Sequence, residues 1–278
     1  MITCKKNDPK VSIIMGIYNC EKTLAEAIES ILNQSFAGWE LIICDDGSTD
    51  DSVGVVNKYQ EVYPNKIFLL KNKKNMGLNF TLNHCLKYVK GEYVARMDGD
   101  DISLPNRLKE EVEFLDSHPE YSIVSCPMIY FDDKGDWGEG KAIEVPKIKD
   151  FVFHAPFHCH APAVIRKEAF FKVGGYTVDK RLLRFEDCNL WYKLYSEGYR
   201  GYNIQKPLYK MRDDRDAYNR RTPSARIRGA YVQYVGFKMI HMPYKYYPFL
   251  LFEFLKDIAI IIMPEKIYTF LHKKKQRG

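Results

Sequence analysis

The chain has 278 residues, which is enough for one large α/β domain with an appendage but too few for several full-sized domains. Hydrophobic residues make up 46% of the sequence and charged residues 28%, a composition that excludes intrinsic disorder. The net charge of +6 is uneven, because residues 1–215 hold 30 Lys and Arg against 32 Asp and Glu, whereas residues 216–278 hold 12 against 4. The near-neutral body argues against nucleic-acid binding, and the apolar content of the basic tail favours an anionic membrane surface as its partner.

The cysteine pattern and the apolar segments predict the cellular location. Seven cysteines are scattered through the sequence without a Cys-x-x-Cys pair, which is typical of reduced thiols in a cytoplasmic protein. The first ten residues lack the apolar core of a secretory signal. The longest apolar stretch, Tyr247 to Met263, is interrupted by charged residues, whereas a membrane-spanning helix needs about 20 apolar residues. We therefore expect a cytoplasmic protein that is peripheral on the inner face of the cytoplasmic membrane.

Strand and helix patterns alternate along the first hundred residues. Short β-branched apolar runs predict the strands, and apolar residues at helical spacing predict the helices. In chain order we expect a strand over 11–17, a helix over 21–34, a strand over 40–45, a helix through 53–59, a strand over 66–70, a helix over 78–89 and a strand over 92–97. Such alternation predicts an α/β fold with a mostly parallel sheet that is covered by helices on both faces.

Polar clusters follow three of the predicted strands, where ligands of open parallel sheets gather. These clusters are Tyr18-Asn19, Asp45-Asp46 and Asp98–Asp101. In the third cluster, Gly99 would let the backbone turn tightly, so that the carboxylates of Asp98 and Asp100 face one cation. Two carboxylates and substrate phosphates are a common ligand set for Mg²⁺, although most isolated Asp-x-Asp triplets are solvated loops.

Other enzymes also place acids at a strand end. The nucleophile loop of a haloacid-dehalogenase-type phosphatase normally opens its domain, whereas Asp98–Asp101 follows three strand and helix units. A sugar nucleotidyltransferase needs a Gly-rich loop with Arg and Lys after the first strand, and Gly16–Glu21 does not supply one. Both alternatives are therefore less favoured by the order of the motifs.

Seven segments together resemble the family 2 glycosyltransferases of the GT-A fold, in that family's order and spacing over about residues 10–212. The segments are Val11–Asn19, Ala27–Gln34, Asp45–Asp50, Asn75–Gly77, Gly91–Asp101, Val173–Tyr176 and Glu186–Asp187. The resemblance implies a Rossmann-like GT-A sheet and inverting transfer of one hexose or N-acetylhexosamine from a nucleotide diphosphate sugar, most simply a UDP-sugar. The implied acceptor is a hydroxyl of a saccharide, lipid-linked or surface-polysaccharide intermediate.

The resemblance also implies roles for individual residues at the donor. Asp98 and Asp100 would hold the divalent metal, Mn²⁺ or Mg²⁺, which neutralises the diphosphate as the glycosidic bond breaks. The residues implied for binding the donor nucleotide are Ile17, Tyr18, Asn19, Asp45, Asp46, Asn75, Gly77, Arg96, Asp98 and Gly99. Residues 45–50 also read as a capped turn into a helix, with Ser48 or Asp50 as N-cap, and Arg96 as an arginine at a strand edge.

On the acceptor side, Asp187 resembles the catalytic base that accepts the proton of the attacking hydroxyl. Without that resemblance, Glu186 and Asp187 read as acids favoured at the start of a helix. The residues implied for the donor and acceptor sugar pocket are Asp101, His160, Glu186 and Trp191. Arg212 resembles a basic residue placed near the diphosphate, although Met211 replaces the usual tyrosine before it.

The basic tail predicts a helix over 248–263 with Glu253, Lys256 and Asp257 on one face, followed by Lys273–Lys275 and Arg277. An amphipathic helix with a basic cluster is suited to an anionic lipid surface, and packing against the protein body is the alternative. We expect a GT-A catalytic domain over 1–215 and a basic amphipathic helical region over 216–278. The functional alternatives are a non-catalytic carbohydrate-binding protein, a phosphatase and a nucleotidyltransferase.

Overall fold

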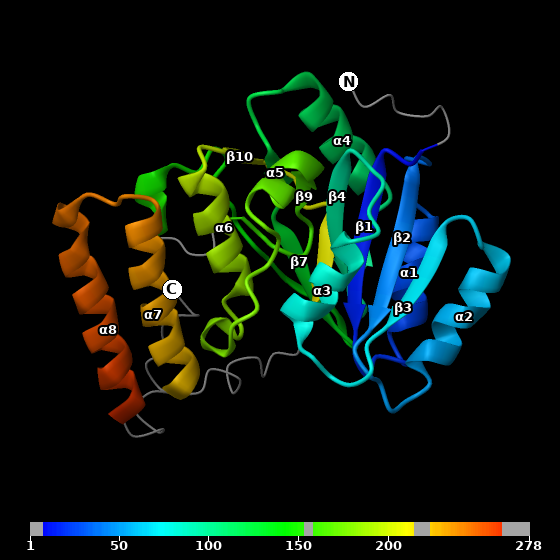
Figure 1. The fold of residues 1–278 in the computed structure, drawn as a ribbon, viewed down its shortest axis with the longest axis horizontal. Helices are drawn as coiled ribbons and strands as arrows, with labels where there is room; N and C mark the ends of the chain where they lie inside the picture. Colours follow the sequence, from blue (N-terminus) through cyan, green and yellow to red (C-terminus); the bar gives the residue numbers. More distant parts are fainter. Residues whose placement is uncertain (1–7, 153–157, 214–222, 263–278) are drawn as a thin grey trace.

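The computed structural model describes residues 8–152, 158–213 and 223–262 as two sheets flanked by helices (Figure 1). The larger sheet has seven strands in the order β10-β6-β9-β4-β1-β2-β3. In that order they are Gly201–Asn203, Ile123–Ser125, Val164–Arg166, Tyr93–Asp98, Val11–Ile17, Trp39–Asp45 and Ile67–Lys71. The smaller sheet has the order β5-β11-β7-β8, which are Ile102–Ser103, Tyr209–Arg212, Met128–Asp132 and Gly135–Glu139.

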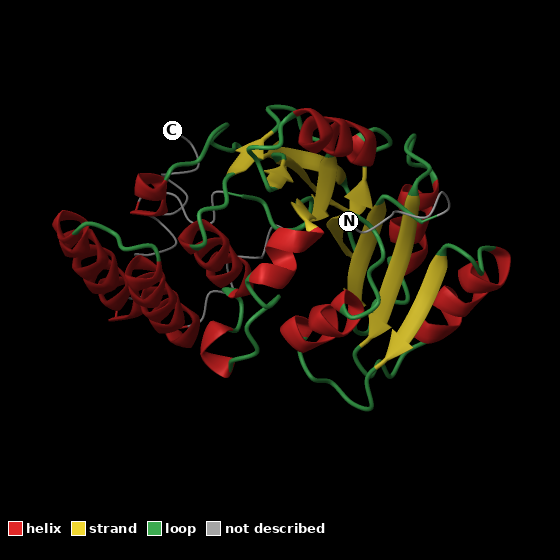
Figure 2. Ribbon diagram, turned by 45° about the horizontal axis from the view of Figure 1, so that its top comes forward, coloured by secondary structure: helices red, strands yellow, loops and turns green. Residues whose placement is uncertain are grey.

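Helices cover both faces of the larger sheet, as Figure 2 shows from a second direction. The α-helices are α1 (Leu24–Leu32), α2 (Ser52–Val62), α3 (Leu78–Leu86), α4 (Arg107–Ser117), α5 (Lys167–Lys172), α6 (Glu186–Ser196), α7 (Pro223–Met239) and α8 (Tyr247–Ile262). Short 3-10 helices are η1 (Ile148–Val152), η2 (Lys180–Leu182) and η4 (Tyr244–Tyr246).

The larger sheet is mostly parallel, as the alternation of strands and helices predicts. β1 pairs in parallel with β2 and β4, β2 with β3, and β10 with β6, whereas β9 runs antiparallel to both β4 and β6. Every residue of β2 is buried, and in β1 only Gly16 is partly exposed, because helices cover both faces. A strand that is buried on both faces is apolar throughout instead of alternating, which is the pattern that the sequence shows.

The helix that follows β2 begins later than the turn analysis predicts. Its N-cap is Asp51, and not Ser48 or Asp50. The Ser48 hydroxyl instead accepts a hydrogen bond from the backbone amide of Asn19 at 3.0 Å, and one Asp50 carboxylate oxygen accepts from the amide of Glu21 at 3.0 Å. The two side chains therefore tie the loop after β2 to the loop after β1.

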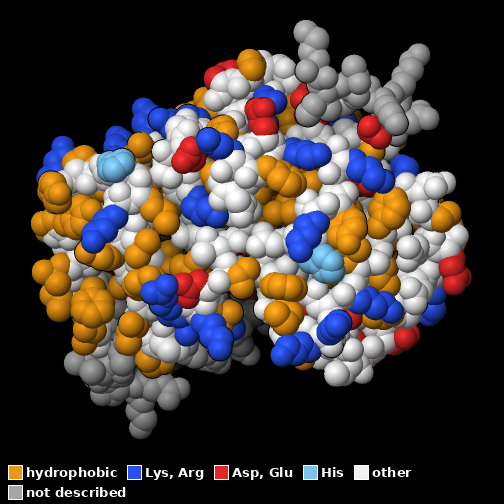
Figure 3. All heavy atoms as spheres, viewed as in Figure 1, with side chains coloured by type: hydrophobic (Ala, Val, Ile, Leu, Met, Phe, Trp, Pro, Cys, Tyr) orange, Lys and Arg blue, Asp and Glu red, His pale blue; other side chains and the backbone are white. Residues whose placement is uncertain are grey.

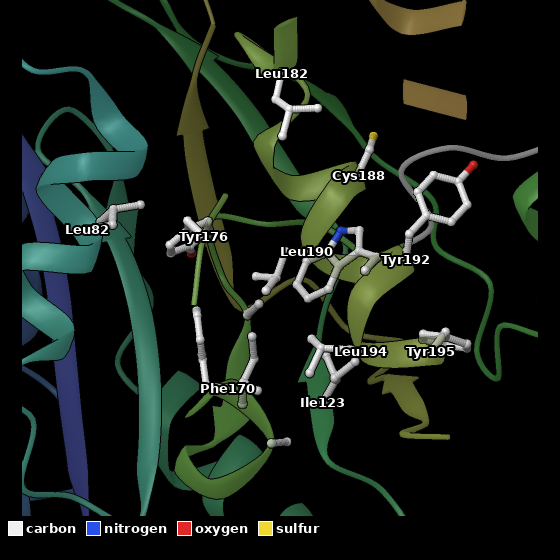
Figure 4. Packing of buried hydrophobic residues seen from close by; sticks show 14 of the residues in the cluster. Leu82, Ile123, Phe170, Tyr176, Leu182, Cys188, Leu190, Tyr192, Leu194 and Tyr195 are labelled. Atoms are coloured by element: carbon white, nitrogen blue, oxygen red, sulfur yellow. The ribbon is translucent and has the colours of Figure 1, made fainter. Parts of the chain in front are cut away.

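Helix α6 contributes many side chains to a large apolar cluster. Figure 4 shows the side chains of α6 packed against residues from α3, α5, β6 and η2. Leu190, Trp191 and Leu194 are completely buried, and Phe151 of η1 stacks on Tyr192 with a ring separation of 4.4 Å. The segment that carries Asp187 is therefore anchored by a large aromatic core.

Helix α7 packs closely against α6 through two glycines one heptad apart. A Cβ at Gly229 would lie 2.8 Å from the ring of Phe185, and one at Gly236 would lie 2.2 Å from the ring of Tyr192. Helix α8 packs in turn on α7, and the two lie side by side in Figure 1. The C-terminal helices thus extend the core around α6.

Several expectations about the tail fall outside the described residues. The division at 215–216 lies within 214–222, and the basic cluster of Lys273–Lys275 with Arg277 lies within 263–278. Helix α8 begins at Tyr247, one residue before the expected start. Among the described residues, no helix combines the length and the apolarity that crossing a membrane requires. The six cysteines in the described part of the chain are all free thiols.

Candidate active site

The loops after β1 and β2 are joined by directional hydrogen bonds. The Asn19 side-chain oxygen accepts from the Thr49 amide at 2.8 Å, and Asn19 adopts a left-handed backbone with φ 51°. A left-handed conformation is uncommon outside glycine and is best tolerated by Asn and Asp. Asn19 therefore joins the loop after β1 to the backbone of the loop after β2.

Asp46 holds the loop that contains Asn75 and Gly77. Its carboxylate accepts hydrogen bonds at 2.8 Å from the side chain of Asn72 and from the backbone amides of Met76 and Gly77. The sequence predicts Asp46 as a nucleotide contact, and in the structure its carboxylate accepts these three hydrogen bonds from the neighbouring loop. Asn75 has an exposed side chain on the same loop.

Asp45 is also buried and bonded locally, with the amide of Ser48 3.1 Å from one carboxylate oxygen. The turn requires Gly47, because its φ is +80° and a Cβ would lie 2.9 Å from the backbone of Lys74. Ile17 points into the core with 2% of its side chain exposed, and its carbonyl accepts from the Asp46 amide at 2.9 Å. Tyr18 is 49% exposed and is the aromatic ring available to cover a base.

Arg96 and Asp98 form a close ion pair at the end of β4, with a separation of 2.6 Å between Arg96 Nη2 and Asp98 Oδ1. The Asp98 amide donates to the hydroxyl of Tyr209 at 3.2 Å. Arg96 is 7% exposed, so it is not an arginine at a solvated strand edge. Gly99 does not adopt a left-handed turn; a Cβ there would lie 3.1 Å from Cys20 Sγ and 3.2 Å from Ile17. Gly99 is needed for close contact with the first loop.

The three acids at this strand end repel one another. Asp100 is exposed to solvent on one side. Desolvation by the surrounding protein and the charge of Asp98 raise its pKa. Burial and the charges of both neighbours raise the pKa of Asp101 well above its usual range. Asp101 accepts a hydrogen bond from the Arg212 amide at 2.7 Å, so its role includes fixing β11 beside β5. A bound cation would relieve this repulsion.

The described residues contain no group of three or more His, Cys, Asp and Glu side chains arranged to hold a metal ion. Asp98 and Asp100 nevertheless fit a divalent cation whose remaining ligands are phosphate oxygens, because such sites use one or two carboxylates. The Arg212 guanidinium is engaged by Asp133 at 2.7 Å and by Glu26 at 3.4 Å. Arg212 is therefore paired with one acid of the β7–β8 turn and one acid of α1.

Asp187 lies in the first turn of α6, next to Glu186. One Asp187 carboxylate oxygen accepts from the Cys188 amide at 2.7 Å. Burial raises the pKa of Asp187, while the Arg96 charge acts in the opposite direction. Burial and the charge of Asp187 raise the pKa of Glu186, which Arg96 also counteracts. The charge of Arg96 thus acts both on Asp98, with which it forms an ion pair, and on the neighbouring carboxylates of Glu186 and Asp187.

His160 contacts Tyr176 and Trp191 and is influenced by the charge of Arg96. The His160 Nε2 atom is 2.7 Å from the hydroxyl of Tyr176, and burial with the Arg96 charge lowers the pKa of His160 well below its usual range. Trp191, predicted for the sugar pocket, is fully buried, and its ring packs edge-on against His160 at a centroid distance of 5.9 Å. His158 is a core residue that bonds to Asn203 at 2.8 Å.

Sequence reasoning missed several residues whose hydrogen bonds hold the predicted site residues in place. Asn72 joins Asp46, Thr81 and His84, and Tyr209 touches the backbone of Asp98. Arg107 is completely buried in α4 and donates to the carbonyl of Arg96 at 3.0 Å. An arginine on the apolar face of the α4 helix, four residues before Glu111, was the available signal.

A shallow cavity of about 460 Å³ between α1 and α2 is lined by Glu29, Tyr59 and Val62, among others. It contains none of the predicted site residues and none of the acids at the strand ends. The predicted site residues lie instead beyond the end of β4 and at the start of α6.

A mostly parallel α/β sheet with acids beyond the end of β4 and a carboxylate pair at the start of α6 has the architecture of a GT-A glycosyltransferase. The family described as "Glycosyl transferase family 2" matches residues 12–178. The chain belongs to this family and is a glycosyltransferase.

Curated relatives match nearly the whole chain. The chain is 42% identical over 267 residues to the "Putative glycosyltransferase EpsE" of Bacillus subtilis, covering 96% of this chain and 94% of the relative. It is 29% identical over 275 residues to the "Amylovoran biosynthesis glycosyltransferase AmsE" of Erwinia amylovora, covering 96% and 99%. An Escherichia coli "UDP-Gal:alpha-D-GlcNAc-diphosphoundecaprenol beta-1,3-galactosyltransferase" is also 29% identical, covering 96% of both chains.

Solved structures share the fold at low sequence identity. Residues 1–349 of S. aureus TarS in complex with UDP-GlcNAc superpose with a TM-score of 0.65 at 18% identity, covering 93% of this chain and 82% of TarS. The mannosyltransferase PcManGT from Pyrobaculum calidifontis, in complex with GDP-Man and Mn²⁺, gives a TM-score of 0.64 at 19% identity, covering 98% and 81%. These similarities establish the GT-A fold of the chain.

Proposed function

We propose that this glycosyltransferase moves a single hexose or N-acetylhexosamine from a UDP-sugar to a hydroxyl of a lipid-linked or surface-polysaccharide intermediate, with inversion. The observation that carries the proposal is the pairing of two acidic sites around one buried cation. Asp98 contacts Arg96 at 2.6 Å, and the charge of Arg96 also acts on Asp187. The shared influence of Arg96 supports diphosphate binding at Asp98 and proton acceptance at Asp187 in one active site. The names of the relatives support this donor and acceptor class.

On the donor side, we assign Asp98 and Asp100 as the residues that hold Mn²⁺ or Mg²⁺. A bound divalent cation supplies Lewis-acid stabilisation of the diphosphate leaving group. Arg96 orients the Asp98 carboxylate through a charge-assisted hydrogen bond. Tyr18 covers the base with its exposed ring, and the loop held by Asp46 closes the nucleotide side.

On the acceptor side, Asp187 takes the proton of the acceptor hydroxyl as its oxygen attacks the anomeric carbon. A general base works best when its pKa approaches the operating pH, and burial moves the pKa of Asp187 in that direction. His160 and Glu186 flank this position and are assigned to the sugar pocket together with Asp101. Attack from the face opposite the leaving diphosphate inverts the anomeric centre.

A panel of UDP-, GDP- and dTDP-sugars tests the donor assignment through release of nucleoside diphosphate with Mn²⁺, Mg²⁺ or EDTA. We expect slow, metal-dependent release from one UDP-sugar, which is lost in Asp100→Asn. Glu61→Gln on the exposed side of α2 is the matched control. Release that continues at the same rate in EDTA and in Asp100→Asn would overturn the metal assignment.

The same panel separates the proposal from its alternatives. A phosphatase would release inorganic phosphate, and a nucleotidyltransferase would release or consume pyrophosphate instead of a nucleoside diphosphate. A carbohydrate-binding protein without activity would release neither product. The neighbouring carboxylates of Glu186 and Asp187 favour glycosyl transfer over these three alternatives.

We also propose that residues 216–278 attach the enzyme to the inner face of the cytoplasmic membrane. Helix α8 buries Leu250 against its neighbours but leaves Leu251, Phe252 and Leu255 54–63% exposed. Figure 3 shows hydrophobic atoms gathered over α7 and α8 at the left edge of the molecule. The exposed apolar side chains and the net basic charge of this region match the requirements of an anionic lipid surface.

Cosedimentation with vesicles of phosphatidylglycerol or phosphatidylcholine tests this attachment. We expect binding to the anionic vesicles that decreases with salt and decreases again in Leu251→Ser/Leu255→Ser. Val62→Ser is the control, because this exposed apolar residue lies on α2. Equal binding of the double variant and the unmodified chain would contradict a lipid-facing α8.

A further inference from the structure

Helix α7 touches the segment that carries Asp187 at a position with no space for a side chain. Phe185 is the N-cap residue of α6 and lies two residues before Asp187. A Cβ at Gly229 of α7 would lie 2.8 Å and 3.1 Å from two atoms of the Phe185 ring, whereas carbon atoms in ordinary contact are about 3.5–4.0 Å apart. Glycine is unfavourable inside a helix, so the helix itself gives no reason for Gly229. The close approach of the Phe185 ring gives one.

Backbone hydrogen bonds connect Phe185 to the start of α6. The Phe185 carbonyl accepts from the amide of Asn189 at 3.1 Å, which is a bond of the first turn of the helix. The Phe185 amide donates to the carbonyl of Leu182 at 2.8 Å, and Leu182 is buried with 4% of its surface exposed. A displacement of the Phe185 backbone is therefore passed to the turn of α6 that contains Asp187.

A second contact joins α7 to the same segment at η2. The guanidinium of Arg181 lies 5.1 Å from the ring centroid of Tyr231, which is on α7 two residues after Gly229. The Asp179 carboxylate accepts from this guanidinium at 2.6 Å and orients it. Helix α7 packs along both η2 and α6, and Figure 1 shows α7 beside α6. The segment before Asp187 is thus held by α7 at Arg181 and at Phe185.

The backbone between these two contacts is strained. Arg184 adopts a left-handed φ of 69°. This conformation is unfavourable for a residue other than glycine and persists where the surrounding structure imposes it. The Arg184 amide also donates to the Glu186 carboxylate, so the strained residue is bonded to the neighbour of Asp187. Strain next to a proposed catalytic group indicates that the position of this segment matters for function.

We infer that Gly229 and Phe185 are positioning residues for the catalytic base, because their contact sets where the Asp187 carboxylate lies relative to the acceptor hydroxyl. This inference rests on the proposed function and gives α7 a part in catalysis. A general base must come within about 2.6–3.2 Å of the oxygen that loses its proton, and a displacement of about 1 Å can cost about a hundredfold in rate. Asp98 and Asp100 follow β4, so a change at this contact should lower turnover without changing donor affinity.

A double-variant cycle tests this contact. Gly229→Leu places a side chain where the Phe185 ring lies, and leucine is a good helix former. We expect Gly229→Leu to lower kcat by about ten- to a hundredfold, with UDP affinity in Mn²⁺ unchanged, and Gly229→Ala to lower kcat less. Phe185→Ala should also lower kcat. Phe185→Ala/Gly229→Leu should recover part of the loss, because the leucine fills the space that the ring leaves.

The measurements are UDP release with the active donor for kcat and KM, calorimetry for UDP, and thermal unfolding. The matched control is Phe237→Leu, which trims a fully buried ring of α7 that packs edge-on against Tyr247 at a centroid distance of 5.8 Å. We expect this control to lower the unfolding temperature and to keep kcat, because Phe237 packs against the start of α8 and not against Phe185 in this contact.

An unchanged kcat in Gly229→Leu and Gly229→Ala would overturn the inference, provided that Asp187→Asn is inactive. So would an equal loss of kcat in Phe237→Leu, because any loosening of α7 would then lower turnover. A loss of UDP affinity in Gly229→Leu would also overturn it, since the contact would then act on the donor site. Turnover above a tenth of the original in Asp187→Asn would instead refute the proposed base.

Discussion

The proposed donor side, at the loops after β1 and β2, and the proposed acceptor side, at α6 and α7, are built by different interactions. On the donor side, Asn19, Ser48 and Asp46 join three loops through hydrogen bonds of 2.8–3.0 Å between side chains and backbone amides. On the acceptor side, α6 and α7 are held by aromatic packing, with Tyr192 and Phe185 against two glycines. Hydrogen bonds are directional and fix individual atoms, whereas apolar packing fixes whole elements. The donor side is thus a set of positioned backbone loops, and the acceptor side is a surface carried on packed helices.

The difference between the two sides is tested most directly by separating donor binding from proton acceptance. We expect Asp187→Asn to reduce turnover by about 10²–10⁴-fold, the usual contribution of a general base, while UDP affinity in Mn²⁺ stays unchanged. Asp100→Asn should lower both turnover and UDP affinity. Steady-state kinetics and calorimetry measure the two quantities. An Asp187→Asn enzyme with more than a tenth of the original turnover would remove Asp187 from the role of base.

The strand that carries Arg96 is supported by a buried ion pair of α4, because Arg107 donates to the Arg96 carbonyl. Arg107 and Glu111 are both fully buried, and their closest atoms are 3.9 Å apart. We expect Arg107→Met to destabilise the fold by about 3–5 kcal/mol, because an unpaired acid remains in the core. Arg107→Met/Glu111→Leu should recover most of this loss in urea unfolding. A double variant that is less stable than Arg107→Met would show that the charges themselves stabilise the fold.

The acceptor side depends on close approach of α7 to α6. We expect Gly236→Ala to destabilise the protein by about 1–3 kcal/mol, because the new methyl group overlaps the ring of Tyr192. Thermal unfolding measures the change. In the background of Tyr192→Leu the same substitution should cost less, since the ring is absent. Equal costs in both backgrounds would mean that the contact between the two helices is not set by this glycine.

The smallest expected effect is that of Arg96 on the pH dependence of activity. The reaction needs ionised Asp187, so activity is lost as pH falls through the pKa of Asp187, which burial raises above the usual aspartate value of about 3.9. The positive charge of Arg96 lowers this pKa. We therefore expect Arg96→Met to move the acid limb of kcat/KM to higher pH, and Arg96→Lys to restore part of its position. An unchanged acid limb in Arg96→Met would uncouple the two acidic sites.

Individual residues show where sequence reasoning reached its limit. The acids of Asp98–Asp101 are at the end of β4 as predicted, because a strand followed by acids places them at one edge of a parallel sheet. Asp46 has the same pattern, but its carboxylate also binds the loop around Gly77. Trp191 has the helical spacing of a core residue and of a pocket residue alike, and it is fully buried. Local patterns place a residue at a strand end or on a helix, but they do not state which groups its side chain meets.

The sequence by itself determined the order of strands and helices, the mostly parallel sheet and the strand ends that carry acids, because apolar periodicity and chain order are local properties. Only the tertiary structure decided that the charge of Arg96 acts on Asp187, that α7 packs on α6 and that Leu183, which precedes Asp187, is exposed. These features join residues about 90 positions apart or depend on the space left between elements. Contacts of that kind are fixed by packing and electrostatics in the folded chain.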